Sequence, residues 1–409
     1  MDQPTFTLTD THRQFRAAVR QMAEDRIAPH AMSVDRDEAF PWESYKALTE
    51  MELPALAFAP EYGGAGADMV TQAIAAEELA RVCASTSVTF LVTKLGMLPV
   101  MNFASEELKR EYLPKVASGQ SQASYCLSEA DAGSDVASMR CRAVRDGDSY
   151  ILNGTKYWIT NAGVSDTYTV FAKTDPDAGH RGISCFLVEK DWGVKVAKLE
   201  HKLGLRGSPT GEVVFEDVRV PASHRIGEEG EGFKVAMSCL DSGRYCVASG
   251  AAGTIRACLD MSVSYARQRR VQGEEIGRFQ LVQQMIAGMA RDYDIARLLW
   301  MRAGWLKNQG QRSSRESALA KWVNSERANR CADDALQVHG ATGFSEECPA
   351  ARYLRNSRAT LIYEGTREVQ TQLAAEYALG YREDRPVRCP LPAWPNEEEA
   401  GSEHSRAPS

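Results

Sequence analysis

The amino-acid sequence predicts an α+β protein in which a β-rich segment stands between two helical ones. Residues 1–120 and 231–382 carry apolar side chains at the spacing of amphipathic helices. Residues 121–230 are instead rich in β-branched and aromatic residues separated by turn signals. The chain has 409 residues, enough for two to three domains, so each segment can form a domain of its own.

Two helices are expected in the N-terminal α-helical domain, residues 1–120. Thr9 or Asp10 could cap the first helix, whose apolar residues fall on one face. A glycine-rich loop at 61–66 precedes a second helix over 71–82, which is rich in alanine and glutamate. These patterns favour a helical domain before the β-rich segment.

The middle β domain, residues 121–230, is expected from its turns and strands. Asp146-Gly147 and Asn153-Gly154 are turn signals. Segments 167–171, 183–188 and 213–215 have the composition of strands.

The C-terminal α-helical domain, residues 231–382, is predicted to contain long helices over 235–265, 279–309 and 317–337. Residues 383–409 contain prolines, an acidic run and a Ser/Gly-rich end, which is typical of a disordered tail. The helix–strand–helix order differs from the alternating order of a doubly wound domain, so we reject a Rossmann nucleotide site.

Composition excludes several function classes. The net charge of −7 is spread along the chain without a basic stripe, so no nucleic-acid partner is expected. No apolar stretch approaches the roughly 20 residues needed for a membrane span, and no secretory signal is recognised. The ten cysteines occur singly, which predicts neither a metal site nor disulfides. A cytoplasmic protein with reduced thiols is expected.

A carboxylate near the C-terminal end of the chain is the first catalytic candidate. Glu364 stands between Tyr363 and Gly365, outside any cluster of charges. A carboxylate partly removed from water has a raised pKa and can act as a base near neutral pH. Gly365 allows close approach of a ligand or an unusual backbone conformation. Alternatively, the run is a helix N-terminus with an acidic first turn.

A candidate site for a flat ring lies at the entry to the β domain. Residues 125–135 offer hydroxyls, small side chains and backbone N–H groups in a loop. Trp158 could stack on a heterocycle while Thr160 donates to its edge. The alternatives are an ordinary Ser/Gly turn and an ordinary core tryptophan.

Four separated motifs resemble those of the flavin-dependent acyl-CoA dehydrogenases. CLSEADAGSDVAS and QVHGATGFSEECPAARYLRN resemble the two signatures of that family, and IYEGT resembles the segment that holds its catalytic base. KLGLRGSPTGEVVFEDVRVP resembles the family's exit from the β domain. The motifs occur in the family's order, and the resemblance extends from about residue 5 to about residue 382.

The resemblance implies a three-domain fold with a middle β-barrel domain and a C-terminal four-helix bundle. It implies FAD as cofactor and oxidation of an acyl-CoA thioester to the trans-2-enoyl form. Glu364 would remove the α-proton while the β-hydrogen leaves as hydride to flavin N5. The thioester carbonyl would be held by the backbone N–H of the base and a ribityl hydroxyl, and Gly365 would leave room for it.

Individual residues take their expected roles from the same motifs. The expected FAD contacts are Tyr125, Leu127, Ser128, Gly133, Ser134, Trp158, Ile159, Thr160, Arg269, Phe279, Gln280, Gln337, Gly340, Ala341, Thr366 and Glu368. The expected substrate contacts are Ser134, Asp241, Arg244 and Gly365. In the family, the contacts that match Phe279, Gln280 and 337–341 usually come from a neighbouring subunit. Arg269 would meet the FAD pyrophosphate, and Arg244 would anchor the substrate.

Three positions bear on how far the family pattern can be carried over. Some members place the base immediately before the arginine that corresponds to Arg244. Here that position is Gly243, so Glu364 is the only candidate at a family base position. Gln272 stands where a phenylalanine is usual, which puts the packing near the adenine in doubt, and Ala341 replaces an expected Gly or Ser.

The resulting hypothesis is a dehydrogenase for short or branched acyl-CoA thioesters, with no metal. The resemblance also implies a homotetramer and an electron-transfer flavoprotein as electron acceptor. Three alternatives stay open: a pathway-specific dehydrogenase for an acyl group bound to a carrier protein in secondary metabolism, an acyl-CoA oxidase, and a non-enzymatic acyl-CoA-binding scaffold. Glu364, Trp158 and Thr160 argue against the scaffold.

Overall fold

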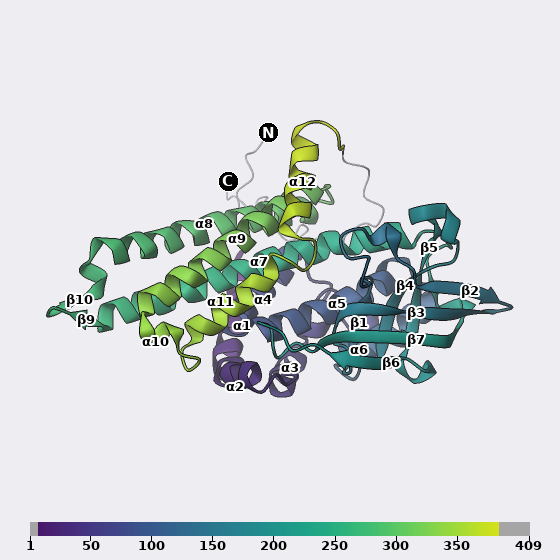
Figure 1. Ribbon diagram of the computed structural model, residues 1–409, viewed down its shortest axis with the longest axis horizontal. Helices are drawn as coiled ribbons and strands as arrows, with labels where there is room; N and C mark the ends of the chain where they lie inside the picture. Colours follow the sequence, from purple (N-terminus) through teal and green to yellow (C-terminus); the bar gives the residue numbers. More distant parts are fainter. Residues whose placement is uncertain (1–6, 384–409) are drawn as a thin grey trace, which may run out of the picture.

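The structure, a computed structural model, describes residues 7–383. Figure 1 shows long helices on one side and a β-sheet on the other, with N-terminal helices packed beneath both. The predicted α+β class and three-part fold are confirmed. The expected tail lies outside the described residues, apart from Glu383.

Within residues 7–120, the N-terminal part contains six α-helices and several shorter helical turns. The Thr9 hydroxyl caps the first by accepting a hydrogen bond from the His12 N–H at 3.2 Å. Asp68 caps the fourth by accepting from the Val70 and Thr71 backbone N–H groups. The helices are α1 (Asp10–Met22), α2 (Ala31–Arg36), α3 (Trp42–Glu50), α4 (Met69–Val82), α5 (Ala84–Phe103) and α6 (Glu106–Ala117).

Helix α5 corrects one expectation drawn from the sequence. It is 20 residues long with a mean hydropathy of 1.3 over its most apolar window, so by length and composition it could span a membrane. The expectation that no apolar stretch approaches that length is therefore wrong. However, 78% of this window is buried inside the fold, where α5 packs against α4, β1 and α7. Among the described residues, α5 is thus a core helix.

The middle part forms one eight-stranded sheet with the order β6-β7-β3-β2-β4-β5-β8, and β1 pairs in parallel with β4. The turn at Asp146-Gly147 is confirmed, because Asp146 pairs with Ser149 across the β2–β3 hairpin. The strands are β1 (Ala123–Cys126), β2 (Arg142–Asp146), β3 (Ser149–Thr160), β4 (Thr167–Lys173), β5 (Ile183–Glu189), β6 (Lys195–Leu199), β7 (Thr210–Pro221) and β8 (Arg225–Ile226).

The second predicted turn, at Asn153-Gly154, is wrong. Both residues lie within β3, where the register with β7 shifts between Leu152 and Gly154. A Cβ on Gly154 would lie 2.8 Å from the Cα of Cys141, so this glycine allows two strands to approach closely. It marks an irregularity in a strand rather than the end of one.

The C-terminal part is built from long helices at the predicted positions. Helices α7, α8 and α9 pack against one another, and α11 packs on α9. A two-residue turn with Gln272 (φ 56°) and Gly273 (φ 84°) joins two short strands between α7 and α8. The elements are α7 (Gly232–Gln268), β9 (Arg270–Val271), β10 (Glu274–Glu275), α8 (Gln280–Asn308), α9 (Ser314–His339), α10 (Ala341–Phe344), α11 (Pro349–Thr360) and α12 (Arg367–Ala378).

Helix α7 connects two of the hydrophobic clusters of the fold. Near its start, Val235 packs in a cluster with Phe171 and Leu187 of the sheet. Farther along, Tyr245 and Ile255 belong to the cluster of the helical bundle. With 37 residues, α7 is about 55 Å long and spans both parts. Residues 241–247 therefore lie where the sheet and the bundle meet.

Candidate active site

Glu364 lies in the tight bend between α11 and α12. Its φ of 55° and the φ of 88° at Gly365 are both left-handed, a conformation that costs a glutamate about 1 kcal/mol or more. Thr366 is the N-cap of α12, because its hydroxyl accepts from the Val369 N–H at 3.3 Å. The alternative of an acidic first helical turn is therefore wrong for Glu364, which precedes the helix.

The Glu364 carboxylate is pressed against α7 at Gly243. A Cβ on Gly243 would lie 2.7 Å from Glu364 Oε2, so only glycine leaves this space for the carboxylate. Oε2 is buried and accepts no hydrogen bond from the described part of the chain. Burial raises the pKa of Glu364 to about 7, although the charges of Arg244, Lys321 and Lys94 act to lower it.

Two side chains hold the backbone of this bend. Lys321 Nζ on α9 donates to the Gly365 carbonyl at 2.6 Å. Gln370 Nε2 on α12 donates to the carbonyls of Glu364 and Gly365 at 3.2 and 3.3 Å. Burial lowers the pKa of Lys321 to about 8, and Glu364 acts in the opposite direction. Neither residue was a candidate from the sequence, although Lys321 stands among the apolar residues that recur at helical spacing in 317–337, which was a usable signal.

Several predicted residues gather around this carboxylate. Arg244 donates from Nη1 to Asp241 Oδ1 at 3.4 Å, while its buried Nε has no hydrogen-bond partner among the described residues. That Nε lies 3.6 Å from the point where a Cβ on Gly365 would stand. Burial raises the pKa of Tyr125 well above its usual value, and the charge of Glu364 adds to this effect. The structure thus brings the predicted substrate residues of α7 to the bend.

A second predicted group forms an open surface on the sheet. Trp158 sits at an irregularity of β3 with a φ of 60°, and its side chain is 64% exposed. An exposed indole on a strained backbone contradicts the alternative of an ordinary core tryptophan. The loop before it is tied to β3, because the Ser128 carbonyl accepts from the Tyr157 N–H at 2.9 Å. Leu127 and Ile159 are buried, whereas Gly133 and Ser134 are exposed.

The third predicted group lies far from this surface. Arg269, Phe279 and Gln280 are exposed near the β9–β10 turn, at the end of the bundle that points away from the sheet (Figure 1). Gln337 is exposed near the C-terminal end of α9. Gly340 and Ala341 follow it, where α10 begins. The rings of Tyr265 on α7 and His339 on α9 stack with their centroids 4.3 Å apart, so the C-terminal ends of these two helices lie together. Within one chain, the structure does not bring this group to Trp158.

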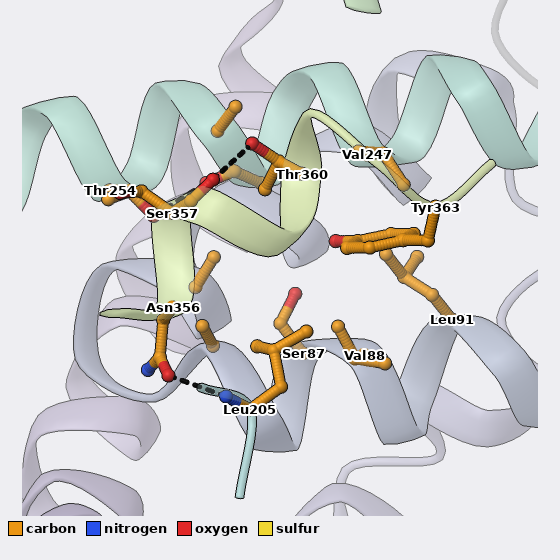
Figure 2. A pocket seen from close by; sticks show the side chains of 14 residues that line it. Ser87, Val88, Leu91, Leu205, Val247, Thr254, Asn356, Ser357, Thr360 and Tyr363 are labelled. Carbon is orange, nitrogen blue, oxygen red and sulfur yellow. Dashed lines mark hydrogen bonds between the residues drawn. The ribbon is translucent and has the colours of Figure 1, made fainter. Parts of the chain in front are cut away.

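A small cavity lies on the other side of Tyr363 (Figure 2). The tyrosine ring faces Leu91 and Val88 of α5 and Val247 of α7, and Ser87 lies deeper in the same wall. The free volume is about 20 Å³, which is room for about one water molecule. Because Tyr363 is adjacent to Glu364, this cavity and the carboxylate are parts of one region.

Comparisons with known proteins assign this architecture to a family. The model of the acyl-CoA dehydrogenase N-terminal domain matches residues 9–120, that of the middle domain matches 124–218, and that of the C-terminal domain matches 230–379. This chain belongs to the acyl-CoA dehydrogenase family. The resemblance seen in the sequence motifs is thereby confirmed.

Individual relatives extend over nearly the whole chain. The probable acyl-CoA dehydrogenase FadE25 of Mycobacterium tuberculosis is 45% identical over 367 residues, which are 89% of this chain and 94% of the relative. The mouse mitochondrial short-chain specific acyl-CoA dehydrogenase is 40% identical, with 91% of each chain covered. The structure of butyryl-CoA dehydrogenase from Megasphaera elsdenii has a TM-score of 0.89 at 35% identity, and covers 93% of this chain and 100% of that one. This acyl-CoA dehydrogenase is therefore a flavoprotein oxidoreductase that acts on CH–CH groups.

Proposed function

We propose that this protein oxidises a short or branched acyl-CoA thioester to the trans-2-enoyl-CoA, with Glu364 as the acceptor of the α-proton. The buried Glu364 Oε2, which accepts no hydrogen bond among the described residues, carries this proposal. A base needs a free lone pair, and burial has already removed the water that would otherwise occupy it. A pKa of about 7 leaves a substantial ionised fraction near neutral pH.

The chain's own groups would position the thioester at this carboxylate. The α-C–H is a weak acid, so the thioester carbonyl must be polarised while the proton leaves. The Glu364–Gly365 bend supplies backbone N–H groups there, and Gly365 carries no side chain that would obstruct the carbonyl. Arg244 anchors the substrate beside the bend, where its Nε has no hydrogen-bond partner within residues 7–383. Tyr363 and α5 exclude water from the opposite side.

FAD is the cofactor that these residues fit. Trp158 presents an exposed aromatic face, and residues 127–134 present backbone and hydroxyl groups next to it, as a flat heterocycle with polar edges requires. When bound there, FAD supplies a hydride acceptor for the β-hydrogen. The separation of the Arg269 and Gln337 group from Trp158 supports a cofactor site completed by a second copy of the chain. A homotetramer would provide that copy.

A short or branched acyl group is the substrate that the relatives support. The mouse relative is named short-chain specific, and the similar structure from Megasphaera elsdenii is a butyryl-CoA dehydrogenase. The cavity behind Tyr363, at about 20 Å³, has room for about one water molecule and does not define the length of the acyl chain. We further propose that the electrons leave to an electron-transfer flavoprotein.

The test is anaerobic reduction of the purified flavoprotein by a panel of acyl-CoAs, followed through the visible flavin band. The wild-type protein is expected to bleach with short or branched chains. Glu364→Gln should keep flavin and substrate binding but slow bleaching by at least about a thousandfold, because the base is lost. Glu376→Gln is the matched control, a carboxylate on α12 that hydrogen-bonds Gln372 and Arg382.

Each outcome of this test separates the hypotheses. Bleaching of Glu364→Gln at the wild-type rate would overturn the assignment of the base. A flavin-loaded protein that no acyl-CoA bleaches would indicate a carrier-protein-bound substrate, and a protein without flavin would favour the scaffold. Rapid reoxidation by oxygen, with release of peroxide, would identify an oxidase.

A further inference from the structure

Lys94 is a buried lysine of α5 whose ammonium group has only neutral partners. The residue is 3% exposed within an otherwise apolar stretch of helix. Lys94 Nζ donates to Gln72 Oε1 on α4 at 2.9 Å and to Cys246 Sγ on α7 at 3.2 Å. Within residues 7–383, no carboxylate lies within ion-pair distance of it. Two neutral acceptors do not compensate the cost of burying a charge.

Lys156 shows how this chain buries a lysine that has only a structural role. It is fully buried, and its Nζ lies 2.7 Å from Glu129 Oε1 while donating also to the Leu127 carbonyl. Its charge is thus neutralised in place. Lys94 has no ion pair of this kind among the described residues. Its charge must therefore be balanced by a carboxylate at a longer distance or by an anion that binds in the site.

The Glu364 carboxylate lies on the same side of α7 as Lys94. Cys246, which accepts from Lys94, follows Gly243 by three residues, and residues three apart share one face of a helix. Gly243 is the residue against which the Glu364 carboxylate rests. The Lys94 ammonium and the Glu364 carboxylate therefore face adjacent turns of α7. The charge of Lys94 also acts to lower the pKa of Glu364.

Other charged and titratable groups surround this pair. They come from the elements packed against the bend or against Lys94: Asp68 and Glu77 at α4, Tyr125 on β1, Asp241, Arg244, Tyr245 and Cys246 on α7, Lys307 on α8, Arg312 between α8 and α9, Lys321 on α9, Tyr363 beside the base, and Glu368 on α12. Arg244 and Lys321 are already engaged, by Asp241 and by the Gly365 carbonyl. Lys94 has only neutral hydrogen-bond partners among the described residues, as does Lys321, but unlike Lys321 it does not hold the backbone of the bend. Lys307 also lacks an ion pair among the described residues, but its charge is not among those that act on Glu364, whereas the charge of Lys94 is.

We propose that Lys94 is a positioning residue for the reaction, whose ammonium serves as the distant counter-charge of Glu364 and keeps this base ionised in the water-poor site. This inference rests on the proposed function of Glu364 and adds to it. Gln72 and Cys246 hold the ammonium at a fixed place without neutralising it. A neutral scaffold around a cation preserves its field, whereas a paired carboxylate would cancel it.

The test is the pH profile of single-turnover flavin reduction, measured anaerobically between about pH 6 and about pH 9. Lys94→Met is expected to move the acid-side midpoint upward by about half a unit to one unit, because the carboxylate loses a stabilising charge. Lys94→Arg should retain the wild-type midpoint. Gln72→Leu should move it less than Lys94→Met, because the charge remains. If the Met variant does not fold, Lys94→Gln takes its place.

The matched control is Lys307→Met. Lys307 is another buried lysine, 7% exposed, and its charge is not among those that shift the pKa of Glu364. The acid-side midpoint of flavin reduction in Lys307→Met should equal that of the wild type. A second readout needs no substrate: the infrared band of the protonated carboxyl, taken as the difference between each protein and its Glu364→Gln version, should titrate with the same shifts.

The outcomes distinguish this inference from the assignment on which it rests. If Glu364→Gln still reduces flavin, the proposed base is wrong. If Glu364→Gln is inactive but Lys94→Met loses rate equally at every pH with unchanged midpoint and infrared band, Lys94 has a structural role only and the inference is overturned.

Discussion

Glu78 and Glu364 both bury carboxylate oxygens, yet the surroundings of these oxygens are opposite. On α4, the carboxylate of Glu78 is 1% exposed and accepts hydrogen bonds from Arg16 at 2.6 Å, Arg20 at 2.8 Å and Arg81 at 3.1 Å. Glu364 Oε2 is inaccessible to water and has no such partner among the described residues. One carboxylate is saturated with donors, and the other is left with a free lone pair.

The pKa values follow from this difference. Burial acts to raise the pKa of Glu78, but the hydrogen bonds and charges of Arg20 and Arg16 outweigh it, so the pKa is lowered. For Glu364, burial outweighs the more distant Arg244, Lys321 and Lys94, and the pKa rises to about 7. Burial alone therefore does not single out a candidate base; a buried carboxylate oxygen that lacks donors and has a raised pKa does.

The largest effect that would sharpen this comparison is on stability. Glu78→Gln should lower the free energy of unfolding by about 3–5 kcal/mol, because three buried or half-buried arginines lose their shared anion. Glu364→Gln makes the same chemical change and should cost little or nothing at neutral pH. Urea unfolding of both variants, each with its flavin content matched, measures the difference. Equal losses would mean that Glu364 is a structural carboxylate as well.

The sequence predicted Glu364 as the candidate base better than it predicted the residues and helices that surround it. The order of helical and β-rich segments was enough for the fold class, and the IYEGT run was enough for the candidate base. Helix α5 was missed because β-branched residues, Gly96 and Pro99 lower its intrinsic helix propensity, while burial between α4, β1 and α7 overrides this preference. Helix propensity depends on the local sequence. The burial that makes α5 a helix depends instead on packing against distant parts of the chain.

The residues around the base were beyond sequence reasoning for the same reason. Lys94, Gln370 and Lys321 reach the bend or its neighbourhood only because α5, α12 and α9 pack around it. Their separation from Glu364 along the chain carries no information about that packing. The sites expected of Arg269 and Gln337 stay predictions, since a single chain places them away from Trp158.

The next effect is the pH dependence of stability caused by Glu364. Its folded pKa of about 7 exceeds the ordinary value of 4.5, so folding favours the protonated form. The contribution to stability is fully present below about pH 4.5 and is lost as the pH rises through about 7, in total about 3 kcal/mol. Glu364→Gln removes this slope. Unfolding measured at several pH values should show wild type and variant diverging across that window, and parallel curves would contradict the buried, unpaired state of the carboxylate.

The smallest effect concerns the space that α7 leaves for the base. In Gly243→Ala, the new Cβ would lie 2.7 Å from Glu364 Oε2 and 2.9 Å from its Cδ, so the carboxylate must shift. A shift of this kind should slow flavin reduction by about tenfold, because proton transfer depends on the placement of the base. Gly250→Ala is the control on the same helix, where the Cβ would meet Ala80 Cβ at an ordinary 3.5 Å. Both changes replace glycine within a helix and gain the same helix propensity, up to about 1 kcal/mol, but only Gly243→Ala must also displace a carboxylate. If Gly243→Ala reduces flavin more slowly than Gly250→Ala without a matching loss of stability, the position of the carboxylate is the cause. Equal rates of the two variants would show that Glu364 does not act from its position beside Gly243.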